Sequence, residues 1–107
     1  MAITVNLYYT GVNGNAHKFV EEMEKSGTAA AIRAEDGNLR YEYFQPFDDP
    51  ETVLLIDSWR NQEAIDAHHS SPMMMIITEL REKYDLRMKV DRFISQDYEN
   101  DNVYIRK

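Results

Sequence analysis

Residues 52–58 constrain the fold most, because they form a strand-like run with hydrophobic side chains on both of its faces. Successive side chains of a strand point to opposite faces of a sheet. Val53 and Leu55 therefore share one face, and Leu54 and Ile56 share the other. The chain must build a sheet that is covered on both faces, by its own helices or by another molecule.

Three further segments have the pattern of strands. Residues 3–9 alternate hydrophobic and polar side chains, residues 39–45 follow a turn-forming cluster with Gly37, and residues 86–94 again alternate. Proline and aspartate residues separate 39–45 from the run at 52–59, so these two strands should form an antiparallel hairpin.

Helical spacing of hydrophobic residues appears in two regions. Residues 15–25 place Ala16, Phe19 and Met23 on one face, and residues 29–34 add a short helical turn. A second helical region begins at Gln62, and Pro72 splits or bends it before it continues to Tyr84.

The resulting order, β-α-β-β-α-β, predicts an α+β domain of the ferredoxin-like, split βαβ type over residues 1–95. It has a four-stranded antiparallel sheet with both helical regions on one face. The other face is left bare, so we expect a homodimer whose two sheets pack face to face as a dimeric α/β barrel. Residues 96–107 are a C-terminal tail, in which residues 103–105 can add a strand at the dimer interface.

Charge and composition exclude several classes of partner. A formal net charge of −7 argues against binding to nucleic acid or to an anionic membrane surface. There is no cysteine, no basic signal-peptide start and no hydrophobic run of about 20 residues, so we expect a cytoplasmic protein without disulfides or thiolate metal sites. The acidic runs lack the spacing of a calcium loop, and no metal is predicted.

The joint between the strand at 52–59 and the next helix holds the candidate functional residues. Trp59 ends the strand, and His68 lies one helical turn beyond the small residue Ala64, which can pack on the sheet. The imidazole of His68 should therefore face inward, with His69 about 100° further around the helix. A histidine in this position can accept a proton from a phenol or an enol.

Several of these residues together resemble the antibiotic biosynthesis monooxygenase family over roughly residues 3–94. The motif comprises residues 35–41, Trp59, Glu63, Ala64, His68, Ser71 and Pro72. The resemblance implies a small dimeric α+β barrel with a ligand pocket between sheet and helices. Family members include quinol and polyketide monooxygenases that need no flavin or metal, an enzyme that processes a phosphorylated signal, and heme-degrading proteins.

From this resemblance we expect a monooxygenase that oxidises a small phenolic, quinol or enolic substrate with dioxygen and no cofactor. His68 would be the catalytic residue, as the base or as an orienting hydrogen-bond donor, and Trp59 would stack on the substrate. The other expected substrate contacts are Asn6, Tyr41, Tyr43 and Met73. His68 stands where the heme-degrading branch has tryptophan, which argues against heme. Leu55 stands where the polyketide enzymes have a polar residue, so their substrate does not carry over.

Two other functions stay open. An isomerase acting on a small phosphorylated molecule would use the same proton transfer at His68, with Arg33, Arg40 or Arg92 as phosphate contacts. Two such arginines in the pocket would favour it. A non-catalytic small-molecule binder would be favoured if Phe19 or Met73 plugged the inner face of His68.

Overall fold

The four strands form one antiparallel sheet in a computed structural model that describes residues 1–107. The strands are β1 (Ile3–Thr10), β2 (Asn38–Phe44), β3 (Thr52–Trp59) and β4 (Arg87–Ile94), and their order across the sheet is β2-β3-β1-β4. The hydrophobic run at 52–58 therefore lies in a central strand. The predicted α+β, ferredoxin-like class and the β2–β3 hairpin are confirmed.

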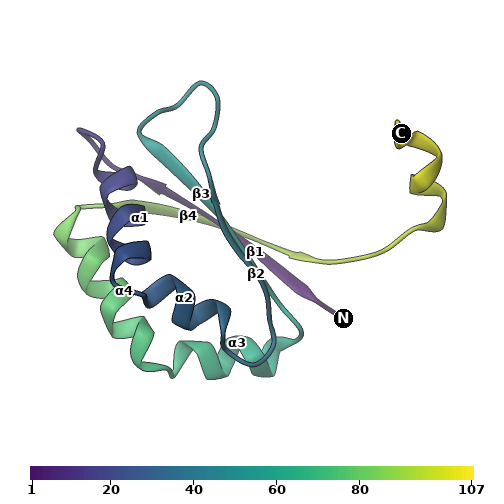
Figure 1. Ribbon diagram of the computed structural model, residues 1–107, viewed down its shortest axis with the longest axis horizontal. Helices are drawn as coiled ribbons and strands as arrows, with labels where there is room; N and C mark the ends of the chain where they lie inside the picture. Colours follow the sequence, from purple (N-terminus) through teal and green to yellow (C-terminus); the bar gives the residue numbers. More distant parts are fainter.

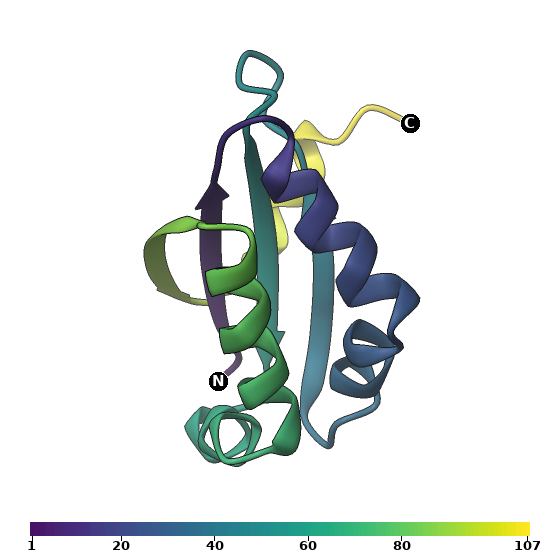
Figure 2. The ribbon, with the colours of Figure 1, turned by 90° about the vertical axis from the view of Figure 1, so that its left-hand side faces the viewer.

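All four helices lie on one face of the sheet (Figures 1 and 2). They are α1 (Asn15–Lys25), α2 (Thr28–Arg33), α3 (Gln62–His69) and α4 (Pro72–Lys83). The predicted split of the second helical region is confirmed, because Ser71 is the N-cap residue of α4 and Pro72 begins the helix. Proline suits this position, since its missing N–H would have no helical partner there.

The hydrophobic core lies between the helices and the sheet. Alternate residues of β1 and β3 supply its floor, with Tyr9, Leu55 and Trp59 almost fully buried. The helices contribute buried side chains that include Phe19 and Ile77. The edge strand β4 is different: its Met88 and Val90 face the helix side of the sheet, yet remain 41% and 52% exposed. The helices therefore leave the sheet partly uncovered along β4.

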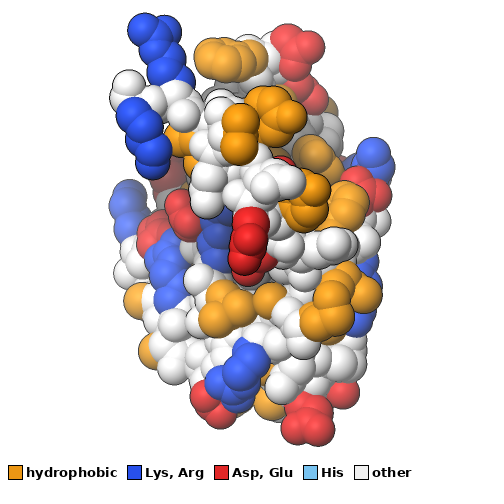
Figure 3. Space-filling model, turned by 90° about the vertical axis from the view of Figure 1, so that its right-hand side faces the viewer, with side chains coloured by type: hydrophobic (Ala, Val, Ile, Leu, Met, Phe, Trp, Pro, Cys, Tyr) orange, Lys and Arg blue, Asp and Glu red, His pale blue; other side chains and the backbone are white.

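The opposite face of the sheet has no helix over it. The pairing register places Leu54 and Ile56 of β3 on this face, beside Tyr8 and Asn6 of β1. Viewed from that side, the surface shows groups of hydrophobic side chains as well as charged ones (Figure 3). The prediction that the chain covers one face of the sheet and leaves the other bare is confirmed.

The C-terminal tail of the single chain forms a 3₁₀ helix, Glu99–Tyr104, whose side chains are exposed. The strand expected at residues 103–105 belongs to the dimer interface and stays a prediction. The last backbone hydrogen bond to the sheet runs from Ser95 N–H to the Ala2 carbonyl, and the tail then leads away from the domain (Figure 1). Asn100, Asp101 and Asn102 suit this short helical segment, because these residue types favour turns over strands.

None of the helices combines the length and the hydrophobicity needed to cross a membrane.

The turn before β2 packs closely against the start of α3. Gly37 has a φ of 89°, and its carbonyl accepts a hydrogen bond of 2.8 Å from the Arg60 N–H. A Cβ atom at Gly37 would lie 2.6 Å from the Cβ of Ala64, which is closer than any real contact between carbon atoms. Glycine is thus required at this position for two reasons, its backbone conformation and its lack of a side chain.

We predict that Gly37→Ala lowers the free energy of unfolding by about 1–3 kcal/mol more than Gly27→Ala does. Gly27 has a φ of 80° but no neighbouring atom within 4 Å of an added Cβ, so its variant measures the backbone cost alone. Denaturant unfolding gives both values. Adding Ala64→Gly should recover part of the Gly37→Ala loss, and equal losses for the two single variants would contradict the overlap with α3.

Candidate functional site

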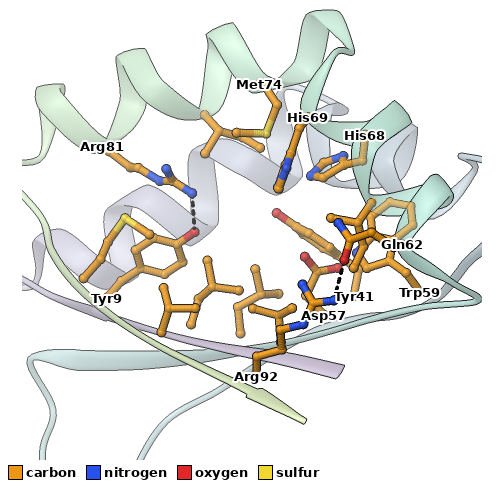
Figure 4. Close-up of a pocket in the computed structure, with 17 residues that line it drawn as sticks. Tyr9, Tyr41, Asp57, Trp59, Gln62, His68, His69, Met74, Arg81 and Arg92 are labelled. Carbon is orange, nitrogen blue, oxygen red and sulfur yellow. Dashed lines mark hydrogen bonds between the residues drawn. The ribbon is translucent and has the colours of Figure 1, made fainter. Parts of the chain in front are cut away.

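A cavity of about 330 Å³ lies between the sheet and helices α3 and α4 (Figure 4). Its lining is mainly hydrophobic, and its polar side chains gather at the two ends. One end contains His68, Trp59, Asp57 and Tyr41, whereas the other contains Tyr9 and Arg81. A concave, mostly apolar cavity with a few convergent polar groups is typical of small-molecule sites.

The sheet forms the floor of this cavity in rows that run across the strands. One row joins Tyr41, Asp57, Val5 and Arg92, which are neighbours in the register of β2, β3, β1 and β4. The next row on the helix face brings Leu55, Leu7 and Val90 together. The polar row is therefore separated from the Tyr9 end by a hydrophobic stretch of floor.

His68 reaches the cavity because of how α3 begins. The Asn61 side chain accepts a hydrogen bond of 2.9 Å from the Ala64 N–H and caps the helix. Ala64 packs on the sheet side, and His68 follows one turn later on the same face, only 4% exposed. The inward orientation expected from the spacing is what the structure shows, although His69 also lines the cavity.

Glu35 fixes the orientation of the His68 ring. The Nδ1–H of His68 donates to Glu35 Oε1 at 2.8 Å, and both side chains are largely buried. With Nδ1 engaged in this way, Nε2 is the ring nitrogen that can accept a proton from a ligand. A buried carboxylate behind a histidine is an arrangement that suits general-base chemistry.

Trp59 packs against His68 rather than standing free in the cavity. The two rings stack with centroids 4.7 Å apart and planes inclined by 28°. Trp59 is 1% exposed, so it is a wall of the cavity and also a support for the imidazole.

Asp57 is the one carboxylate that lines the cavity. Its Oδ1 is buried without a hydrogen-bond partner. Burial raises the pKa of Asp57 to about 7, the Trp59 side chain opposes this rise, and the negative charge of Glu35 adds to it. Near neutral pH the carboxyl group of Asp57 can therefore give or take a proton inside the cavity.

The other end of the cavity is closed by Arg81 and Tyr9. The Nη2–H of Arg81 donates to Tyr9 Oη at 3.1 Å, while the Nε of Arg81 is buried without a partner. Burial raises the pKa of the Tyr9 phenol. Met74 and Ile77 of α4 cover the space between the two ends.

Three of the six residues expected from the sequence line the cavity: His68, Trp59 and Tyr41. The others lie elsewhere. Asn6 is on the opposite face of the sheet, because it pairs with Ile56 and Asp91 rather than with the rows described above. Tyr43 lines a separate, smaller cavity beside α1, and in α4 Met74 rather than Met73 lines the main cavity.

Sequence reasoning missed Glu35, Asp57 and Arg81 as site residues. A signal existed for Asp57, because it alternates with Leu55 and Trp59 and so had to share their face. Glu35 and Arg81 have partners 33 and 72 residues away in the chain, and no local pattern reveals such pairs. No three His, Asp or Glu side chains lie close enough together to hold a metal ion.

Comparisons with known proteins give one family match. A family model described as antibiotic biosynthesis monooxygenase matches residues 2–75. No curated protein matches the chain.

Solved structures with a similar fold include SnoaB, a cofactor-independent oxygenase from Streptomyces nogalater, with a TM-score of 0.75 and 16% identity over 92% of this chain and 96% of that one. PA3566 from Pseudomonas aeruginosa gives a TM-score of 0.76 and 24% identity over 90% and 95% of the two chains. A conserved protein from Methanosarcina mazei Go1 gives a TM-score of 0.77 and 18% identity over 90% of this chain and 94% of that one. Identities this low show a shared fold only.

We predict that Asp57→Asn changes how stability depends on pH. Folded Asp57 keeps its proton up to about pH 7, whereas the unfolded chain releases it near its usual value of 3.8. Rising pH therefore favours unfolding of the wild type across this window. Between about pH 5 and pH 8 the free energy of unfolding of the wild type should fall by about 2 kcal/mol more than that of Asp57→Asn, as measured by denaturant unfolding. Parallel pH profiles for the two proteins would contradict the assignment.

Proposed function

Because the chain belongs to the antibiotic biosynthesis monooxygenase family, we propose that its cavity oxidises a small phenolic, quinol or enolic substrate with dioxygen and without a cofactor. The observation that carries this proposal is the buried hydrogen bond between His68 and Glu35 at the wall of a mainly hydrophobic cavity. This pair supplies a base where an electron-rich aromatic molecule fits.

In the proposed reaction His68 Nε2 takes a proton from the substrate and leaves an electron-rich anion. Glu35 stabilises the resulting imidazolium through the Nδ1–H hydrogen bond. The anion then reduces dioxygen. For a ring substrate with an activated methylene group, one oxygen atom becomes a carbonyl and the other leaves as water with the two methylene hydrogens. Four electrons pass from carbon to oxygen in that conversion.

In this proposal Asp57 is a second proton carrier beside His68. With a pKa raised to about 7 it can donate a proton to reduced oxygen and later recover it. Trp59 acts by holding the His68 ring from one side, and Tyr41 offers a hydroxyl in the same row of the floor. Stacking of Trp59 on the substrate, expected from the sequence, stays a prediction.

One observation favours a second candidate, an isomerase that acts on a small phosphorylated molecule. Two arginines line the cavity, Arg92 and Arg81, and such a pair suits a phosphate group. Arg33 and Arg40, the other expected contacts, are paired with Glu24 and Glu42 outside the cavity. The non-catalytic alternative has less support, because neither Phe19 nor Met73 lines the cavity in front of His68.

We also propose that two copies of the chain associate through the bare face of the sheet. Leu54 and Ile56 occupy its centre, with Phe44 and Phe93 on the flanking strands 39% and 51% exposed. Ion pairs lie at the two edges, Arg40 with Glu42 on β2 and Lys89 with Asp91 on β4. A hydrophobic centre with a charged rim is typical of protein interfaces. A second copy of the chain offers the same pattern and buries both hydrophobic centres at once.

We predict that the protein consumes oxygen with hydroquinone or anthrone in the absence of added metal or flavin, as measured with an oxygen electrode. His68→Gln should lower kcat by about 10²–10⁴-fold, because its amide can still bond Glu35 but cannot act as a base. Glu35→Gln should lower kcat by about 10–100-fold through loss of ring orientation.

The matched control is His17→Ala, since His17 is exposed on α1 and far from the cavity floor. It should leave oxygen consumption unchanged. Oxygen consumption that is unchanged in His68→Gln would show that His68 is not the base. Isomerisation of a phosphorylated ketose without oxygen consumption would favour the second candidate.

We predict a light-scattering mass of twice the 12.6 kDa of one chain at micromolar concentration. Ile56→Asp should shift the mass toward the single chain, because a buried unpaired carboxylate at the centre of the interface is costly. Phe47→Asp is the control, since Phe47 is fully exposed in the β2–β3 loop. A wild type that scatters as one chain would rule out this dimer.

A further inference from the structure

The two arginines of the cavity differ from the other arginines of the folded domain. Arg33, Arg40, Arg60 and Arg87 each form an ion pair with a carboxylate. Arg81 and Arg92 form none, although the chain has 19 acidic residues and only 12 basic ones. In the folded domain of this acidic protein, the arginines left without a carboxylate are therefore those that line the cavity.

The cavity is therefore more positive than the protein around it. Two guanidinium groups line it, against the single carboxylate of Asp57. Burial raises the pKa of that carboxyl to about 7, so at neutral pH much of it is uncharged. A local excess of positive charge in a hydrophobic cavity attracts a ligand with a negative group.

Arg81 is the better placed of the two arginines to bind such a group. Its side chain is half-buried, its Nε is buried without a partner, and its Nη2–H donates to the neutral hydroxyl of Tyr9. Arg92 is exposed at the edge strand, where water can solvate it, and its Nη2–H donates to Gln62 Oε1. The guanidinium of Arg81 thus has an unused donor in a poorly hydrated place.

Arg81 and His68 lie at opposite ends of the cavity (Figure 4). On the floor, Tyr9 stands four residues along β1 from Val5, which belongs to the polar row with Asp57. At 3.3 Å per residue this spacing is about 13 Å. Leu7, Leu55 and Val90 fill the interval, so a ligand that reaches from one end to the other has a hydrophobic middle.

We propose that the substrate carries a permanent oxyanion, a carboxylate or a phosphate, which Arg81 binds together with the Tyr9 hydroxyl at the end of the cavity away from His68. The planar guanidinium suits both anions because each can accept two parallel N–H hydrogen bonds. The reacting hydroxyl then lies at His68, and only this last placement rests on the proposed oxygenase function. The substrate class is an elongated aromatic or enolic acid with its hydroxyl and its anion at opposite ends.

The experiment measures binding by titration calorimetry with the full chain, without turnover and under nitrogen. Three probes share a bicyclic ring and a hydroxyl: 6-hydroxy-2-naphthoate, its methyl ester, and 6-hydroxynaphthalen-2-yl phosphate. We expect the carboxylate or the phosphate to bind at least about tenfold more tightly than the ester, which corresponds to one good charged contact. Whichever anion binds more tightly identifies the group.

Three variants locate the contact. Arg81→Gln should bring the anion-to-ester ratio of Kd values close to one, while Arg81→Lys should keep part of the preference because it keeps the charge. Arg40→Gln is the matched control, since Arg40 pairs with Glu42 on the opposite face of the sheet and should keep the full ratio. The Lys variant also covers the case in which Arg81→Gln fails to fold.

Equal affinities of the wild type for the ester and both anions would overturn the proposal, as would an unchanged ratio in both Arg81 variants. If Arg92→Gln abolished the preference for the anion over the ester while Arg81→Gln kept it, the assignment to Arg81 would be overturned. Since no oxygen takes part, a failure of the oxygenase proposal would leave these affinities as they are, and the two proposals fail independently.

Discussion

The candidate site depends on how one short turn packs against the joint between β3 and α3. Three consecutive residues make this contact: Glu35 accepts from His68, Asp36 pairs with Arg60, and Gly37 fits against Ala64. The α3 helix has only eight residues, too few to be stable alone in water. Its position, and with it that of the imidazole, is set by these contacts and not by helix propensity. The buried hydrogen bond and the missing Cβ therefore act on the same helix, the first at His68 and the second at Ala64.

Each strand of the sheet contributes different side chains to the floor of the cavity. β2 and β3 contribute the hydroxyl of Tyr41 and the carboxyl of Asp57. β1 supplies hydrophobic surface and the hydroxyl of Tyr9, and β4 supplies Arg92 at the edge. Because the helices leave β4 uncovered, the cavity is bounded there by a strand with one neighbour. The acidic surface and the positive cavity are compatible, since charges on the far side of the sheet are screened by water.

Local patterns in the sequence predicted the strands, the helices and the inward orientation of His68, because these follow from side-chain periodicity and from the small residue Ala64. They did not predict which side chains meet across the fold. Asn6 was assigned to the cavity although its place between Val5 and Leu7 puts it on the other face of the sheet. The sequence indicates Met73, whereas Met74 lines the cavity, because Pro72 starts a new helix whose rotation about its axis does not follow from that of α3. Glu35 and Arg81 act through partners far away in the chain, and such pairs become visible only in three dimensions.

The stacking of Trp59 on His68 has an optical consequence. The chain contains one tryptophan, so its entire indole emission originates at the wall of this cavity. An imidazole stacked on an indole quenches the emission differently in its neutral and protonated forms. The protein thus carries a built-in fluorophore beside the group assigned to proton transfer, and stopped-flow emission can follow ligand arrival and ring protonation in real time without any attached dye.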